Sequence, residues 1–556
     1  METTKSNSRG AGNSFAPSRR AFLKQSSLLV AAAGAGGLGL ARAASGQTAA
    51  SALFVVTETT CGKVQGMNLG GINTFKGIPY GASTAGKNRF MPPKKPASWS
   101  GIRDAFEFGQ ISPQVMADTR GDYTQLIDWD LQSGGLGEDC LVLNVWTPGL
   151  KDGGKRPVMV SFHGGGYAIG SGAEPGYDGD PLARFGNVVV VTMNHRLASF
   201  GYLDLTGLGA PPEFAQAGVA GMMDLVASLE WIRDNIENFG GDPNTVMIWG
   251  QSGGGAKTSV MMAMPSAKGL FKRAAVQSGS QLDMPKREAS TATAEKLLKQ
   301  LGLDKSRIAD IQKLSWEQIL EAQTAVGGAG AGGGFAPTLD GTVIPQNPFD
   351  PTAPAVSSDV PMIISTALDE AALALTNFDL DEAGLKKIVD RIAGSNADRV
   401  LKLYRSVYPQ TSPFLIQARI LTDRGFRASA TKQAERKSAL GKAPAYQYLF
   451  TWPSPGYGGK FGAVHGTDVG LVFHSARGSI CGGGADAKAL ADRMAATWVA
   501  FAKTGDPNNS AIPHWAPYDA QSRPTMVFDN TIGLENDPRR EFRLLWDELG
   551  TGSPLG

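Results

Sequence analysis

A serine between glycines is the first feature of this sequence that could do chemistry. Ser252 lies in residues 250–254, Gly-Gln-Ser-Gly-Gly, which fit the Gly-x-Ser-x-Gly pattern of nucleophilic serines. Glycine makes up 71 of the 556 residues, so the pattern needs support from its surroundings. An apolar stretch at 246–249 predicts a buried strand before it, and residues 254–262 predict a helix after it. This context favours a hydroxyl exposed on a sharp turn beside a helix N-terminus.

A second glycine run could hold the negative charge that forms when a serine attacks a carbonyl carbon. Residues 163–166, His-Gly-Gly-Gly, directly follow the apolar stretch 157–162. Glycines at a strand end expose backbone N–H groups with no side chain in the way, as a tetrahedral intermediate requires. We expect the donors to be the amides of Gly165, Gly166 and Gly253. The alternative is an ordinary glycine turn.

The general base is expected among five histidines. In chains with this serine motif the acid and then the histidine follow the nucleophile, which excludes His163 and His195. His465 lies in a glycine-flanked loop, which would let its imidazole reach across to the serine. His474 follows apolar residues, which is typical of a helix end or of packing, and His514 lies in a late loop. We therefore favour His465.

The carboxylate that orients the base should follow a parallel strand, where loops build the site. Residues 361–365 predict such a strand, and Asp369 and Glu370 follow within a short turn. Their spacing does not choose between them. Asp340, in Leu-Asp-Gly, is more typical of a turn. The chosen carboxylate would fix the imidazole tautomer and stabilise the imidazolium.

Alternating strands and helices must position these residues. Continuous apolar runs bounded by Gly and Pro suit buried parallel strands, and helical patterns lie between them. The expected fold class is α/β, with a large, mostly parallel central sheet flanked by helices in one domain, residues 44–556. The Gly/Ala-rich segment 327–334 is expected to be a flexible loop within it. The segments are antiparallel edge strands at 52–57, 62–67 and 72–76, parallel strands at 141–146, 157–162, 188–193, 245–249, 274–277 and 361–365, and helices at 221–236, 254–262, 292–301, 316–325 and 382–392.

The first 43 residues, 1–43, are typical of a targeting segment. Arg19 and Arg20 precede a weakly apolar run at 26–40, and Ala-Arg-Ala at 41–43 supplies small residues for a signal peptidase. The segment resembles a twin-arginine export signal, so we expect the export machinery as a partner and a periplasmic or secreted bacterial protein. The apolar run is shorter than the roughly 20 residues of a membrane span, so no stable anchor is expected.

Composition and cysteine usage exclude several other classes. The formal net charge is +2 and no basic stretch stands out, so nucleic acid is not an expected partner. Three cysteines, Cys61, Cys140 and Cys481, make no disulfide framework, although one bridge is possible. No Cys/His cluster has metal-ligand spacing. A partial P-loop pattern lacks its glycines at Gln251 and Ala256. We expect neither a metal nor a cofactor.

At this point the motifs match a known family. From about Glu58 to about Leu545 the chain resembles the type-B carboxylesterase/lipase group, which includes cholinesterase-like proteins. The resemblance implies an α/β-hydrolase fold and ester hydrolysis without a cofactor. It assigns the nucleophile to Ser252, the acid to Glu370 and the base to His465, with oxyanion donors on the three glycine amides named above. The motifs that carry it are residues 75–80, 138–145, 163–166, 194–197, 238–243 and 250–254.

The chain also departs from the family pattern. The residue before the nucleophile is commonly Glu in the family and is Gln251 here, which removes a charge and argues against cationic substrates. The usual cysteine partner of Cys140 is missing, since Ser112 stands near its place. Trp129 could line the entrance to the site or pack within a lid.

The expected function is hydrolysis of small carboxylic esters through an acyl-enzyme. The same catalytic residues could serve a lipase, an amidase, or a carbamate or lactone hydrolase. A non-catalytic binding module on the same fold is a further alternative, because some cholinesterase-like relatives have lost the serine.

Overall fold

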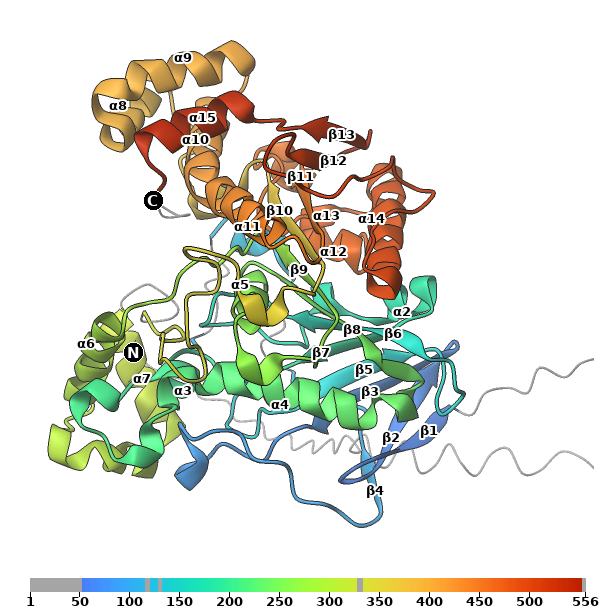
Figure 1. Cartoon of the computed structure of the whole chain (residues 1–556). Helices are drawn as coiled ribbons and strands as arrows, with labels where there is room; N and C mark the ends of the chain where they lie inside the picture. Colours follow the sequence, from blue (N-terminus) through green and yellow to red (C-terminus); the bar gives the residue numbers. More distant parts are fainter. Residues whose placement is uncertain (1–52, 116–120, 129–132, 328–333, 553–556) are drawn as a thin grey trace, which may run out of the picture. The chain divides into compact units, whose positions relative to one another are not determined.

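The chain is built around one mixed β-sheet. The computed structural model describes residues 53–115, 121–128, 133–327 and 334–552. The predicted export signal, Trp129 and most of segment 327–334 therefore lie outside the described residues. Within these ranges thirteen strands run in the order β1-β2-β3-β5-β7-β6-β8-β9-β10-β11-β12-β13, and β4 pairs with β2 (Figure 1). The strands are β1 Phe54–Thr59, β2 Gly62–Leu69, β3 Ile72–Pro79, β4 Ile102–Asp104, β5 Val142–Thr147, β6 Arg156–Phe162, β7 Val189–Met193, β8 Gly241–Gln251, β9 Arg273–Gln277, β10 Met362–Ala367, β11 Ala445–Phe450, β12 Pro524–Phe528 and β13 Gly533–Asn536.

The centre of the sheet is parallel and its edges are antiparallel. Strands β7, β6, β8, β9, β10, β11 and β12 are neighbours in that order and all pair in parallel. Strands β1, β2 and β3 pair antiparallel at one edge, and β13 pairs antiparallel with β12 at the other. The predicted α/β class, with a mostly parallel sheet and antiparallel N-terminal strands, is confirmed.

One predicted strand direction is wrong. The apolar run 141–146 predicts a parallel strand, but β5 pairs antiparallel with both β3 and β7. Every residue of β5 is buried. A continuous apolar run reports burial on both faces of a sheet, and burial on both faces does not fix strand direction.

Helices cover both faces of the parallel centre (Figure 1). Alternate residues of one strand belong to different cores, as the two-residue period of a strand requires: Val158 and Val160 pack on the side of α4, and Met159 packs on the side of α14. Helices α10 and α11 join through a π-helical turn, η14, Asp423–Arg427. The helices are α2 Asp180–Gly186, α3 Ala198–Tyr202, α4 Ala220–Asn235, α5 Gly253–Met261, α6 Arg287–Gln300, α7 Trp316–Gly327, α8 Glu382–Ala393, α9 Ala397–Val407, α10 Pro413–Thr422, α11 Ala428–Ala439, α12 Val469–Val472, α13 Gly478–Cys481, α14 Ala485–Thr504 and α15 Arg540–Leu549.

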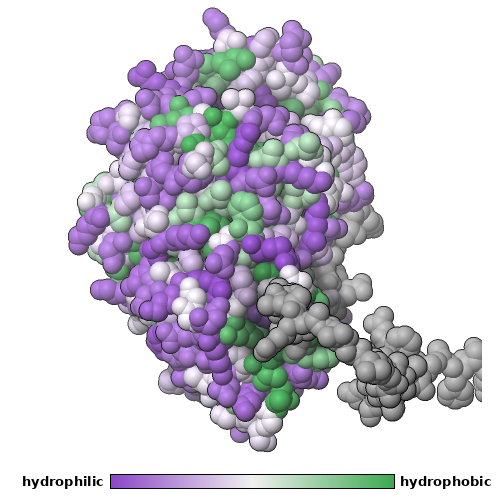
Figure 2. All heavy atoms as spheres, turned by 90° about the vertical axis from the view of Figure 1, so that its right-hand side faces the viewer, coloured by the Kyte–Doolittle hydropathy of each residue, from purple (hydrophilic) through white to green (hydrophobic). Residues whose placement is uncertain are grey.

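The surface carries both hydrophilic and apolar side chains. Figure 2 shows a mainly hydrophilic face with apolar side chains gathered toward its lower end. Large apolar side chains are exposed on the N-terminal strands, at Phe54, Val56, Leu69 and Ile102. In the part of the chain that the structure describes, none of the helices combines the length and the apolar character that crossing a bilayer would need.

Candidate active site

Ser252 occupies a strained turn between the central strand β8 and helix α5. Its φ and ψ are 57° and −123°, a region that non-glycine residues rarely adopt. The Ser252 N–H donates to the carbonyl of Gln277 on β9 at 2.8 Å, which ties the turn to the neighbouring strand. The strand–turn–helix context predicted for Ser252 is present.

The glycines of the motif permit very close backbone contacts. A Cβ on Gly254 would lie 2.0 Å from the carbonyl oxygen of Phe162, at the end of β6. A Cβ on Gly250 would lie 2.5 Å from the carbonyl carbon of Gly254. The turn can therefore form only if both positions lack a side chain.

The second glycine run lies directly against the first. An added Cβ on Gly253 would be 2.2 Å from the Gly166 carbonyl oxygen and 2.4 Å from its nitrogen. Gly165 and Gly166 have φ of 80° and 62°, which glycine adopts without strain. Within the described ranges, the N–H groups of Gly165 and Gly166 make no backbone hydrogen bond in a turn or loop. Gly253 is the first residue of α5, where helical N–H groups lack helical partners. Gly166 thus lies against Gly253, the residue after Ser252, and Gly165 precedes Gly166 in the same glycine run.

His465 and Glu370 form the closest acid–base contact of the site. The His465 Nδ1 lies 2.5 Å from Glu370 Oε2, and both side chains are buried. The other carboxylate oxygen, Oε1, accepts the N–H of Ala367 at 2.6 Å, which fixes the carboxylate at the end of β10. An added Cβ on Gly466 would lie 3.8 Å from the side chain of Gln251, so the histidine loop lies beside the residue that precedes Ser252.

Comparison with known proteins shows the family of this chain. Residues 53–543 match the Carboxylesterase family. The chain belongs to this family.

Several relatives of this carboxylesterase are similar over nearly its whole length. A para-nitrobenzyl esterase of Bacillus subtilis is 34% identical, over 88% of this chain and 97% of that protein. A phenmedipham hydrolase of Pseudarthrobacter oxydans is 31% identical, over 85% and 94%. The crystal structure of a carboxylesterase from Geobacillus stearothermophilus is 32% identical and has a TM-score of 0.77, over 88% of this chain and 99% of that one. The chain is therefore a serine ester hydrolase with an α/β-hydrolase fold.

Asp369, the alternative acid in this carboxylesterase, contacts the histidine loop rather than the imidazole. Its Oδ1 accepts from Arg419 Nε at 2.8 Å, and its Oδ2 accepts the N–H of Ala463 at 2.9 Å. Its own N–H donates to the Ala463 carbonyl at 3.0 Å. Burial raises the pKa of Asp369, and Arg419 opposes that shift. Asp369 thus holds the loop that carries His465, and Glu370 is the acid that meets the ring.

The remaining candidate histidines have structural surroundings. The rings of His163 and His195 stack at 4.8 Å, and burial lowers the pKa of both, which keeps them neutral. His474 stacks on Phe185 at 4.1 Å and contacts Asp492, as expected of a packing residue at a helix end. His514 is exposed.

Sequence reasoning missed a buried polar network beneath His465. Asp468 accepts from the Tyr448 hydroxyl at 2.6 Å and from Gln277 Nε2 at 2.9 Å. Burial raises the pKa of Asp468. The Tyr123 hydroxyl donates to the His465 carbonyl at 2.9 Å, and so holds the same loop from the other side. Asp468 follows His465 by three residues, but its partners lie on β9 and β11, which no local pattern connects.

The structure shows the surroundings of two positions where the chain departs from the family pattern, Gln251 and the missing cysteine partner of Cys140. Gln251 is buried, and its Nε2 has no hydrogen-bond partner in the described chain. Cys61, Cys140 and Cys481 are all free thiols. Ser112, which stands near the place of the missing cysteine, accepts the N–H of Leu197 at 3.1 Å.

Proposed function

We propose that Ser252, His465 and Glu370 act as a catalytic triad that hydrolyses small carboxylic esters through an acyl-enzyme. The observation that carries the proposal is the 2.5 Å contact between His465 and Glu370, in a loop that borders the Ser252 turn. A carboxylate on Nδ1 orients the imidazole so that Nε2 can accept a proton.

The reaction has two balanced halves. His465 Nε2 takes the Ser252 hydroxyl proton as Oγ bonds to the ester carbonyl carbon, and the amides of Gly165, Gly166 and Gly253 stabilise the oxyanion. The bond to the alcohol oxygen then breaks, and that oxygen takes the proton from His465. A water molecule attacks the acyl-enzyme, gives its proton to His465 and releases the carboxylic acid, while Ser252 regains its proton.

The proposal is tested with a para-nitrophenyl ester and an organophosphate. Ser252→Ala should lower kcat/KM by about 10⁴-fold or more and abolish organophosphate labelling. Glu370→Gln should lower kcat by several orders of magnitude while Ser252 stays in place. Ser266→Ala, on an exposed serine outside the site, is the control. Turnover by Ser252→Ala at a tenth of the wild-type rate, with a serine labelled elsewhere, would overturn the assignment.

We base the proposed ester preference on Gln251, whose side chain carries no charge. An amide beside the nucleophile offers no charge to a cationic alcohol group, so neutral esters are expected to have the higher kcat/KM. Relatives include a para-nitrobenzyl esterase, a phenmedipham hydrolase and a bile salt-activated lipase. A panel of neutral and cationic esters of equal size, with an anilide, a carbamate, a lactone and a long-chain ester, measures the preference. A cationic ester that is turned over fastest would contradict it.

Export through the twin-arginine route is a separate proposal, supported by Arg19 and Arg20 before the run at 26–40. A double Arg19→Lys, Arg20→Lys variant should accumulate in the cytoplasm of a bacterial host, whereas the unaltered chain should reach the periplasm or medium. Equal distribution of both proteins would refute it.

A further inference from the structure

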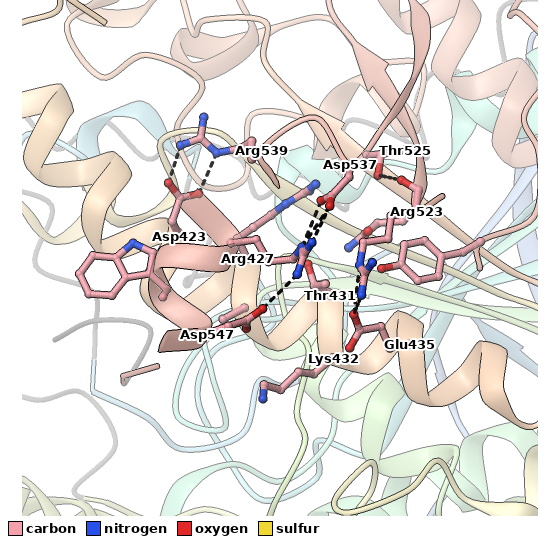
Figure 3. Close-up of a pocket in the computed structure, with 15 residues that line it drawn as sticks. Asp423, Arg427, Thr431, Lys432, Glu435, Arg523, Thr525, Asp537, Arg539 and Asp547 are labelled. Atoms are coloured by element: carbon pink, nitrogen blue, oxygen red, sulfur yellow. Dashed lines mark hydrogen bonds and ion pairs between the residues drawn. The ribbon is translucent and has the colours of Figure 1, made fainter. Parts of the chain in front are cut away.

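A polar cavity lies away from Ser252, beside the π-helical turn η14. It is enclosed by this turn, by α11, by β11 and β12, and by residues just before and within α15 (Figure 3). Its volume is about 50 Å³. At ~10–15 Å³ for each water, the space suits roughly four waters or one small ion.

The acidic side chains that line the cavity are already engaged. Five cationic and four acidic residues face it, and each of the four carboxylates has an arginine partner (Figure 3). Asp423 is bound by Arg539, with Nε 2.8 Å from Oδ1, and also by the Tyr404 hydroxyl. The other pairs are Arg523 with Glu435 at 2.7 Å, and Arg543 with Asp537 at 2.6 Å and with Asp547 at 3.0 Å.

Two of the five cations, Arg427 and Lys432, have no such partner in the part of the chain that is described, and of these two Arg427 is the buried one. It is only 8% exposed, and among the described residues no carboxylate lies within ion-pair distance of it. Within the described ranges, the one hydrogen bond of its side chain is a long contact of 3.4 Å from Nη1 to the Thr366 hydroxyl. Burial, followed by the charge of Arg539, lowers the pKa of Arg427 to about 10, so the side chain still carries its charge at neutral pH. A buried charge with no counter-ion is costly.

Two further donors face the same cavity without an acceptor. Gln447, on β11, and Tyr518, before β12, both line it and are at least 97% buried. The Nε2 of Gln447 and the hydroxyl of Tyr518 have no hydrogen-bond partner in the described part of the chain. Together with the Arg427 guanidinium, three donors from separate elements meet in a space that offers them no free carboxylate.

We propose that this cavity binds one small monovalent anion, chloride or a carboxylate of one or two carbons, through Arg427, Gln447 and Tyr518. Such an anion supplies the missing counter-charge and accepts from all three donors, whereas water supplies no charge. The volume and the neighbouring Asp423 and Asp537 disfavour larger or doubly charged anions. The proposal does not rest on the proposed ester hydrolysis.

The position of the site connects it to the catalytic base. Phe426, the residue before Arg427, packs its ring on His465 at 5.4 Å between centroids. Thr366, which Arg427 contacts, precedes Ala367, whose N–H binds Glu370. An anion bound to Arg427 therefore stabilises the π-helical turn η14, whose Phe426 packs against His465.

The test measures thermal unfolding of the full chain in sodium chloride, sodium acetate or sodium gluconate at equal ionic strength. Chloride or acetate should raise Tm with a saturable dependence on concentration, as ligand binding to the folded state requires, and gluconate should not because it is too large. Arg427→Met should abolish the dependence. Arg391→Met, on an exposed arginine, is the matched control and should keep it.

Tyr518→Phe is a second test that holds even if Arg427→Met does not fold, because it removes one hydroxyl and keeps the ring. The anion concentration at half-saturation should rise by about tenfold, the effect of one hydrogen bond to a charged group. An equal response of Tm to all three salts would overturn the proposal. So would a response to chloride or acetate that is the same in wild type, Arg427→Met and Tyr518→Phe.

Discussion

Lys257 offers a sharp test of the physical reasoning about the oxyanion loop. It lies on α5, one turn beyond Ser252, and is completely buried. Its Nζ donates to the His163 carbonyl at 3.0 Å, at the start of the glycine run. Burial lowers the pKa of Lys257 to about 7, and Glu174 opposes that shift. The perturbation is Lys257→Met, which keeps the length of the side chain and removes the amine.

The magnitude follows from the two pKa values of the lysine. The unfolded chain holds the proton up to a pKa near 10.5, whereas the folded chain releases it near pH 7. Between these values the unfolded state binds more protons, so the stability of the wild type increases with pH. One proton corresponds to about 1.4 kcal/mol per pH unit, approached only above the folded pKa. Relative to Lys257→Met, the wild type should therefore gain about 2 kcal/mol from pH 7 to pH 9.

Urea unfolding of both proteins at pH 6, 7, 8 and 9 measures this gain. The difference in unfolding free energy between wild type and Lys257→Met should be constant from pH 6 to about pH 6.5 and then rise. Lys268→Met, on an exposed lysine of the same region, controls for loss of an amine at the surface. A difference that stays flat across the whole range would refute the argument, because it would mean that Lys257 keeps its proton when folded.

Three further predictions concern the elements around the nucleophile and base. Asp369→Ala should destabilise the fold by about 3–5 kcal/mol, because it leaves Arg419 without its buried partner, and Asp369→Asn should cost less and keep more activity, measured by urea unfolding and kcat. Gly254→Ala should yield no active, folded enzyme on expression, since its Cβ would meet the β6 backbone at 2.0 Å, whereas an active variant would contradict the turn geometry. Gln251→Glu should raise kcat/KM for a cationic ester relative to a neutral ester of equal size, because it places a negative charge beside the nucleophile; an unchanged ratio of the two kcat/KM values would contradict the role given to Gln251.

Much of the fold and site was predictable because the relevant signals are local in sequence. The Ser252 motif, its preceding strand and its following helix are contiguous, so sterics alone select the turn. The same holds for the glycine run after β6. Burial patterns predicted the parallel strands β6 to β10, but they could not give the direction of β5, since an apolar run reports only that both faces are covered. Strands β11, β12 and β13 and helix α14 were not predicted at all.

The buried polar groups around the site could not be predicted, because their positions depend on contacts between segments that are distant in the sequence. No local pattern links Asp468 with Tyr448 and Gln277, which come from three different parts of the chain. The burial of Lys257 could not be predicted for the same reason. A lysine on a helix is usually solvated, and only tertiary packing buries this one.

The adjacent acids Asp369 and Glu370 show why spacing could not choose between them. Both follow β10 and both are buried, yet they face different parts of one partner segment: Glu370 meets the ring of His465, and Asp369 meets the backbone of Ala463 two residues earlier. The two contacts join the same two segments, the turn after β10 and the loop that carries His465. The ion pair with Arg419 holds Asp369 in place, and Asp369 in turn holds the backbone of the loop that brings His465 to Glu370.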